Sequence, residues 1–225
     1  MTQSWKYAAK SGTHGLAFGP NDEVLYSADL SGDAVWTHKV HSSGSVEAVS
    51  SYPMPETGMH PRHLIAHPSG RYIYVVMEAG NEIVAYSVNN ITGSKTKDYW
   101  SAEVKLSASS KLLWATARAQ SGTNDTGFIS QFSLSNEGII TSQVFMIPTT
   151  TINGIANAVS PASWSDEWMA LADAPKGYVQ VWQLVKGNST QTGMEASSEG
   201  WTSVKMVAQV DINDGGCCAN VIWYD

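Results

Sequence analysis

The chain has 225 residues, of which 43% are hydrophobic and 15% charged, and 13 Lys and Arg against 20 Asp and Glu give a formal net charge of −7. This composition predicts a globular protein and argues against nucleic acid or an anionic membrane surface as a partner. No stretch reaches the roughly 18 apolar residues of a membrane span, and the first residues lack the apolar centre of a signal peptide, so we expect a soluble, cytoplasmic protein. The adjacent Cys217 and Cys218 are then expected to be buried and reduced.

An internal repeat organises the chain. The segment HGLAFGPNDEVLYSADLSGDAVW, which starts at His14, aligns with RHLIAHPSGRYIYVVMEAGNEIVAY, which starts at Arg62, at a separation of 48 residues. A third copy, VKLSASSKLLWATARA, lies 40 residues beyond the second, and a looser fourth copy, NAVSPASWSDEWMALADAPKGYVQVWQL, places Ser160-Pro161 on His67-Pro68. The closing CCANVIWYD looks like the opening strand of a fifth copy. This periodicity predicts a repeat architecture.

Each copy predicts the same order of elements. A short apolar strand is followed by a turn of Pro, Ser, Gly or Asn, a strand of β-branched and aromatic residues, a turn of small residues and a strand with alternating apolar positions. Four-stranded antiparallel units of about 45 residues are typical of β-propeller blades. We therefore predict an all-β fold with a single β-propeller domain over residues 1–225. An all-β sandwich is the alternative, but it does not explain the repeat.

The number of blades is smaller than a closed ring requires. About four and a half units fit into the chain, whereas a seven-bladed ring needs on the order of 350 residues. We therefore expect a propeller chain that lacks the N-terminal blades of a complete ring.

Two sets of equivalent positions carry the chemistry. His14 and Arg62 occupy the same place in neighbouring copies, and Glu78 and Arg118 share a second place, which Asp173 approaches in the fourth copy. Propellers bind ligands where equivalent strand ends meet near the central channel. An inward arginine is unfavourable without an anionic partner, so either these carboxylates or those of a ligand must neutralise it.

The remaining arginine and histidine residues are weaker indicators of function. Arg71 matches Lys111 in a turn, which indicates a solvated cation. Pro61 excludes a helix around His60 and His63, and their odd separation places them on opposite faces of a strand, which argues against a metal site. His67, at a strand-ending turn, is expected to hydrogen-bond to the backbone, whereas two further histidines are expected to be exposed in an outer strand or loop: His38 and His41.

At these residues a family resemblance emerges. HPRHLIAHPSGRYIYVVMEAGNEIVAYSV resembles the pattern G-P-R-H…H-P-[NS]-G-[KR]-Y-x-Y-V-x-N-E of the lactonase seven-bladed propeller family, which includes bacterial 6-phosphogluconolactonases and fungal carboxy-cis,cis-muconate cyclases. The segments HGLAFGPNDEVLYSADLSGDAVW, LLWATARA and GGCCANVIWYD are most similar to the fungal cyclase branch. The chain departs from the pattern where MEAG replaces the usual NE, and in its short third copy.

The resemblance implies an isomerase without metal or cofactor, which closes 3-carboxy-cis,cis-muconate to a carboxymuconolactone in aromatic catabolism. Carried over by position, the catalytic residues are His14, Arg62, Glu78 and Arg118. Arg62 and Arg118, with His63 and Asp173, are expected to bind the substrate carboxylates.

The expected chemistry adds a tethered carboxylate across a conjugated double bond, so orientation matters more than activation. Arginine forks would orient the carboxylates and stabilise the enolate-like charge. His14 is preferred over Glu78 as the proton donor, because histidine titrates near neutral pH without burial.

Three alternatives remain. The same residues could serve a lactone hydrolase of the 6-phosphogluconolactonase type, or the propeller could be a non-catalytic interaction scaffold. A metal-dependent lactonase would use Glu78, Asn153 and Asp173. The expected partner is a small polycarboxylate, and a homo-oligomer is left open.

Overall fold

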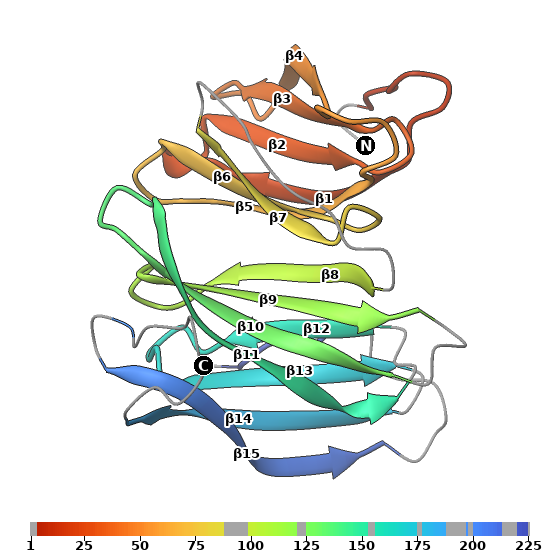
Figure 1. Ribbon diagram of the computed structural model, residues 1–225. Coiled ribbons are helices and arrows are strands. Elements are labelled where there is room, and N and C mark those ends of the chain that lie inside the picture. Colours follow the sequence, from red (N-terminus) through yellow and green to blue (C-terminus); the bar gives the residue numbers. More distant parts are fainter. Residues whose placement is uncertain are drawn as a thin grey trace. The chain divides into compact units, whose positions relative to one another are not determined.

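The computed structural model describes residues 4–87, 99–120, 125–152, 156–174, 177–187, 197, 200–212 and 220–224. Within these ranges the chain forms β-strands and one short 3-10 helix (Figure 1), and no helix in them is long and apolar enough to cross a membrane. The chain divides into two compact units, Met1–Lys97 and Asp98–Asp225. Each unit is described by itself below.

The first unit contains two antiparallel sheets, with the strand orders β1-β2-β3-β4 and β5-β6-β7. Its strands are β1 (Thr13–Phe18), β2 (Val24–Asp29), β3 (Ala34–Val40), β4 (Val46–Pro53), β5 (Pro61–Ala66), β6 (Tyr72–Met77) and β7 (Glu82–Ser87), with the 3-10 helix η1 at Pro20–Asp22. The opening strands β1 and β5 contact each other. Adjacent opening strands are what successive blades of a propeller predict.

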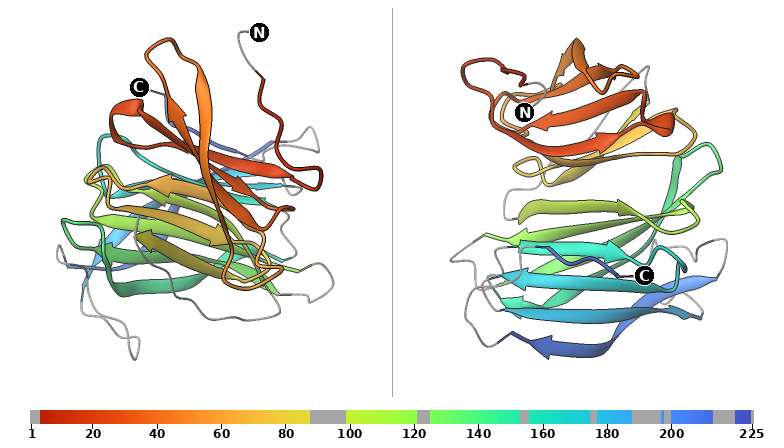
Figure 2. Two further views of the ribbon diagram at one scale, coloured as in Figure 1. Left: turned by 90° about the horizontal axis from the view of Figure 1, so that it is seen from above. Right: turned by 180° about the vertical axis from the view of Figure 1, so that it is seen from behind.

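The second unit contains two four-stranded antiparallel sheets, with the orders β8-β9-β10-β11 and β12-β13-β14-β15. Its strands are β8 (Tyr99–Leu106), β9 (Leu112–Ala119), β10 (Thr126–Leu134), β11 (Ile140–Ile152), β12 (Ala156–Pro161), β13 (Trp168–Ala174), β14 (Tyr178–Lys186) and β15 (Trp201–Asp211). Figure 2 shows the same sheets from two further sides. Here too the opening strands, β8 and β12, contact each other.

Burial follows the pattern of the strands. In β14 buried and partly exposed residues alternate along YVQVWQLVK, because successive side chains of a strand point to opposite faces. The second strand of a sheet is more apolar: Tyr74 in β6, Trp114 at the matching place in β9, and Met169 in β13 are each 0% exposed. Each unit has its own apolar cluster, and the cluster of the first unit draws residues from both of its sheets, such as Val35 and Val75. A pair of sheets is therefore the packing unit.

One hairpin recurs in all four sheets and confirms the repeat. An amide just after the opening strand donates to a carbonyl at or next to the start of the second strand. The pairs are Gly19 to Val24 at 2.7 Å, and His67 to Tyr72, Ser107 to Leu112 and Ala162 to Trp168, each at 2.9 Å. Ala162, rather than Ser160, therefore occupies the place of His67, so the alignment of the fourth copy was wrong by two residues. Five residues lie between Ala162 and Trp168, against four in each of the other hairpins, and this extra residue hid the register.

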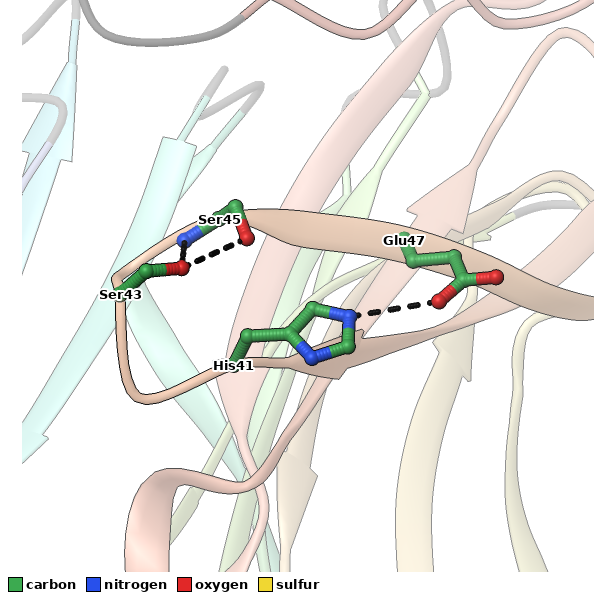
Figure 3. Close-up of polar contacts among 4 residues, drawn as sticks. All are labelled: His41, Ser43, Ser45 and Glu47. Carbon is green, nitrogen blue, oxygen red and sulfur yellow. Dashed lines mark hydrogen bonds and ion pairs between the residues drawn. The ribbon is translucent and has the colours of Figure 1, made fainter.

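The two histidines that were expected to be exposed differ in their exposure to solvent. His41, in the turn between β3 and β4, lies 3.3 Å from the Glu47 carboxylate and is 38% exposed at its side chain, which confirms that prediction (Figure 3). The prediction for His38 is wrong, because this residue is 1% exposed. The segment before β1 covers it: the Tyr7 hydroxyl lies 3.3 Å from His38 Nε2, and the ring of Trp5 lies edge-on to the imidazole.

Candidate functional site

Three of the four predicted site residues of the first unit lie in irregular places of the opening strands. In β1 the pairing with β2 shifts between Thr13 and Gly15, so that His14 is the extra residue. In β5 the pairing with β6 shifts between Pro61 and Leu64, and this stretch contains Arg62 and His63. A β-bulge re-aims the side chains of the extra residues and is common beside active sites.

The same irregularity recurs in β8, where the pairing with β9 shifts between Ser101 and Glu103. In contrast, β12 pairs with β13 without a shift. The bulge is thus a feature of three of the four opening strands that the structure describes.

Arg62 and Glu78 form an ion pair in the first unit. Arg62 Nε lies 3.5 Å from Glu78 Oε2, and each side chain is 15% exposed. Glu78 directly follows β6, and its backbone amide donates to the carbonyl of His60 at 2.8 Å. The pair therefore sits half-buried at the ends of two neighbouring strands, where an arginine can face solvent and a carboxylate at once.

Two histidines lie beside this pair. The rings of His14 in β1 and His63 in β5 are 4.7 Å apart between centroids and are tilted by 45°. Gly15 allows this approach: a Cβ atom at that position would lie 2.6 Å from the Arg62 carbonyl oxygen and 2.8 Å from His63 Cα. Real Cβ atoms do not approach backbone atoms so closely, so glycine is required where β1 passes β5.

Asp29 anchors the chain that leads into β1. Its carboxylate is 1% exposed. It accepts hydrogen bonds from Gly12 N at 2.8 Å, Gly32 N at 2.9 Å and Trp36 Nε1 at 3.1 Å. Burial alone would raise the pKa of Asp29, but these hydrogen bonds outweigh it and lower the pKa. Gly12, just before β1, is thus held by a carboxylate that stays charged.

Arg118 lies in the second unit, near the end of β9. Its guanidinium carbon sits 5.2 Å from the ring centroid of Trp100, which is its cross-strand neighbour in β8. An arginine over a tryptophan face gains cation–π energy and loses freedom of rotation. Trp100 therefore fixes the direction in which Arg118 presents its donors.

Asp173 lies at the end of β13 in the second unit and is 0% exposed. Its Oδ2 accepts a hydrogen bond from the Tyr178 hydroxyl at 2.9 Å, and that hydroxyl also contacts the hydroxyl groups of Thr150 and Thr151. Burial raises the pKa of Tyr178, and the charge of Asp173 adds to this effect. Asp173 thus belongs to a buried polar network.

Four of the six predicted residues form two contacting pairs in the first unit, Arg62 with Glu78 and His14 with His63. Arg62 and His63 are neighbours in the bulge of β5. Arg118 and Asp173 are described within the second unit, so the convergence of all six stays a prediction. Asn153 and the two cysteines lie outside the described residues. Within the described ranges, no group of three or more His, Cys, Asp or Glu side chains could hold a metal ion.

Sequence reasoning missed a buried carboxylate in β8. Glu103 follows the bulge of that strand, is 3% exposed and lies 3.7 Å from Lys105 Nζ. Its place corresponds to that of His63, 40 residues earlier. The signal was available, because extending the third copy by one residue toward the N-terminus would have included Glu103. Trp100 and Tyr178 had no such signal, since their roles depend on contacts across strands and sheets.

Sequence comparison shows which known proteins the chain resembles. A family model described as "Lactonase, 7-bladed beta-propeller" matches residues 6–153. The carboxy-cis,cis-muconate cyclase of Neurospora crassa is 35% identical over 99% of this chain. Muconate cycloisomerase 1 of Cutaneotrichosporon cutaneum is 26% identical over 76% of the chain. The chain spans 63% and 51% of the lengths of these two relatives.

Solved structures show the same fold. A putative 6-phosphogluconolactonase from Bacteroides uniformis matches with a TM-score of 0.63 at 21% identity, over 88% of this chain and 58% of its own. The periplasmic gluconolactonase of Pseudomonas aeruginosa matches with a TM-score of 0.62 at 17% identity, over 88% of this chain and 57% of its own. The predicted all-β propeller fold is therefore confirmed, and the chain belongs to the lactonase seven-bladed β-propeller family.

Proposed function

We propose that this protein is a cycloisomerase that closes 3-carboxy-cis,cis-muconate to a carboxymuconolactone without metal or cofactor. The observation that carries the proposal is the half-buried ion pair between Arg62, in the bulge of β5, and Glu78, directly after β6. His63, the chain neighbour of Arg62 in the same bulge, pairs in turn with His14 of β1. The similarity to the Neurospora crassa cyclase supports the choice of reaction.

In the proposed reaction, one carboxylate oxygen of the substrate forms a C–O bond with a carbon of the conjugated diene. The electron pair of the double bond moves toward the conjugated carboxylate, and a proton then bonds to the α-carbon. A guanidinium has five N–H donors, so Arg62 can hold Glu78 through Nε and face a substrate carboxylate with its remaining nitrogens. Donors placed where negative charge develops lower the barrier of such a step.

We assign the proton donor as His14 and the orienting carboxylate as Glu78. Glu78 lies against Arg62, where it fixes the direction of the guanidinium. His14 is exposed in the bulge of β1 and stacks near His63, so it can reach a bound molecule. Arg118, which lies over Trp100, and Asp173 keep their expected substrate-binding role on the sequence pattern alone.

The test is turnover of 3-carboxy-cis,cis-muconate by the purified chain, followed by loss of diene absorbance and by detection of the lactone. Arg62→Ala is expected to lower kcat/KM by about 10²–10³-fold, because it removes donors aimed at developing charge. Arg62→Lys should recover only part of this loss, since lysine lacks the planar fork. The matched control is Arg71→Ala, because Arg71 is exposed in a turn and should not affect turnover. Equal activity of Arg62→Ala and wild type would contradict the proposal.

A lactone hydrolase is the second candidate. The 6-phosphogluconolactonase of Bacillus subtilis is 33% identical over 37% of this chain, which favours it over a scaffold. In this reading, the same residues would polarise a lactone carbonyl and position water. Turnover of 6-phosphogluconolactone with no loss of carboxymuconate would establish the hydrolase and exclude the cyclase.

The proposal carries three further expectations. The reaction would belong to aromatic-compound breakdown, the protein would act in the cytoplasm, and any self-association would be between identical chains. Cell fractionation and sedimentation of the full chain test the last two.

A further inference from the structure

The connection between β4 and β5 leads directly into the bulge that holds Arg62, and a single residue of the first sheet binds it at three points. Asp33 lies in the turn between β2 and β3. Its Oδ2 accepts a hydrogen bond from Gly58 N at 2.5 Å, and its Oδ1 accepts one from His60 N at 2.9 Å. Its backbone carbonyl accepts a third from Met54 N at 2.9 Å. The start, middle and end of the connection are thus tied to Asp33.

The backbone of this connection is strained at His60. His60 has φ +56° although it is not glycine and precedes Pro61. The left-handed region is unfavourable for such a residue, and a residue before proline prefers extended backbone. Strained residues of this kind persist only where the surroundings hold them, at a typical cost of about 1–3 kcal/mol. The hydrogen bond from His60 N to Asp33 supplies part of that hold.

The same connection also holds the other half of the ion pair. The carbonyl of His60 accepts the hydrogen bond of Glu78 N at 2.8 Å. The carbonyl of Met59 accepts those of Ala79 and Gly80, each at 3.2 Å. Displacement of residues 58–60 would therefore move the backbone of Glu78 as well as that of Arg62.

We infer that Asp33 is the positioning residue of the Arg62–Glu78 pair, acting through the backbone of residues 58–60. The expected effect of Asp33 on catalysis rests on the proposed function. Its expected effect on the backbone of residues 58–60 does not, because it follows from contacts within the first unit. Asp33 touches neither member of the pair, so its effect is on their placement. A shift of about 1 Å at a catalytic group can reduce a rate by up to about 100-fold.

The chemistry of the side chain explains why a carboxylate stands there. Two oxygen atoms can accept from two backbone amides at once, as Gly58 N and His60 N do. An asparagine has one acceptor oxygen and would keep one of the two bonds. An alanine would keep neither, and it tolerates the φ of +53° at this position less well than aspartate. The three side chains therefore form a graded series.

The experiment compares Asp33→Asn and Asp33→Ala with the matched controls Asp22→Asn and Asp22→Ala in the full chain. Asp22 is also an aspartate with positive φ, at +57°, but it is exposed in η1. Three quantities are measured for each variant: amide hydrogen exchange of residues 58–60 and 78, kcat and KM with 3-carboxy-cis,cis-muconate well below the melting midpoint, and the melting midpoint itself.

For Asp33→Ala we expect exchange at His60 and Glu78 to accelerate about tenfold, in line with local opening. We also expect kcat to fall at least about tenfold, with a smaller change in KM, because placement rather than charge is lost. Asp33→Asn should fall between this variant and wild type. Both Asp22 variants should match wild type in exchange and kcat.

Unchanged exchange at residues 58–60 and 78 in Asp33→Ala would overturn the positioning role. So would a loss of kcat that tracks the fraction of unfolded protein, because a merely structural residue would act in that way. If wild type does not turn over carboxymuconate, the proposed function fails, whereas the inference about Asp33 is still decided by the exchange pattern. If Asp33→Ala does not fold, the same criteria are applied to Asp33→Asn.

Discussion

His38 shows how a polar residue of an outer strand can become part of a core. Its Nε2 lies 3.0 Å from Ser27 Oγ and 3.3 Å from the Tyr7 hydroxyl. Burial lowers the pKa of His38, since the imidazolium would lose its hydration. The segment before β1 creates this environment, and no pattern within β3 reveals that a residue 31 positions earlier in the chain covers the strand.

The lowered pKa predicts a pH dependence of stability. Below the ordinary histidine pKa of about 6.5 the unfolded chain binds a proton that the folded His38 does not, so the free energy of unfolding should decrease as the pH falls from 6.5 toward the lowered value. Urea unfolding at a series of pH values measures this slope. His38→Gln should flatten the slope, whereas His41→Gln, at an exposed position, should leave it unchanged. Equal slopes in wild type and His38→Gln would contradict the prediction.

The opening strands β1 and β5 hold three of the residues of the candidate site. The bulge in β1 makes His14 an extra residue, and the bulge in β5 sets Arg62 and His63 against a single residue of β6. The close passage of these two strands brings the histidine rings together. The repeat alignment grouped His14 with Arg62, and Glu78 with Arg118, because equivalent positions of a repeat are readable without coordinates. It could not show the bulges, since a pairing shift becomes visible only when both strands are placed.

The close passage predicts that Gly15→Ala is harmful. Its Cβ would overlap the backbone of Arg62 and His63, which cannot rotate away as a side chain can. We expect a loss of about 1–3 kcal/mol in the free energy of unfolding, as for other overpacked sites, and reduced turnover, because the bulge of β5 must shift. Gly187→Ala is the control, since its Cβ would meet only Thr202 Oγ1 at 3.5 Å. Urea unfolding of the two variants checks the prediction; a loss in Gly187→Ala as large as that in Gly15→Ala would refute it.

The chain carries a net charge of the same sign as its proposed substrate. The net charge is −7, yet the proposed substrate is itself anionic. The site therefore depends on a few arginines in fixed places rather than on a general positive field. The same balance gives the chain a pI near 5.3, above which like charges keep molecules apart.

This charge predicts how the chain associates. Several apolar side chains are exposed, among them Leu16, Phe18 and Val210. As the pH falls from 8 toward 5.3, repulsion between molecules disappears and these side chains are free to associate. Light scattering should therefore rise toward pH 5.3, and 1 M NaCl at pH 8, about a 3 Å screening length, should produce part of the same rise. Constant scattering across this range would show that the exposed apolar residues do not drive association.

The sequence is enough to predict the order of strands, the recurring hairpins and the all-β class, and to match His14 with Arg62 and Glu78 with Arg118. Each of these depends on short-range periodicity or on equivalence between repeats. The folded structure was needed to show that Arg62 pairs with Glu78, that Trp100 lies under Arg118 and that Asp33 holds the connection into β5. These contacts join residues from different strands and turns. Their free energies depend on distances that arise after the sheets have packed, and no local pattern in the chain records those distances.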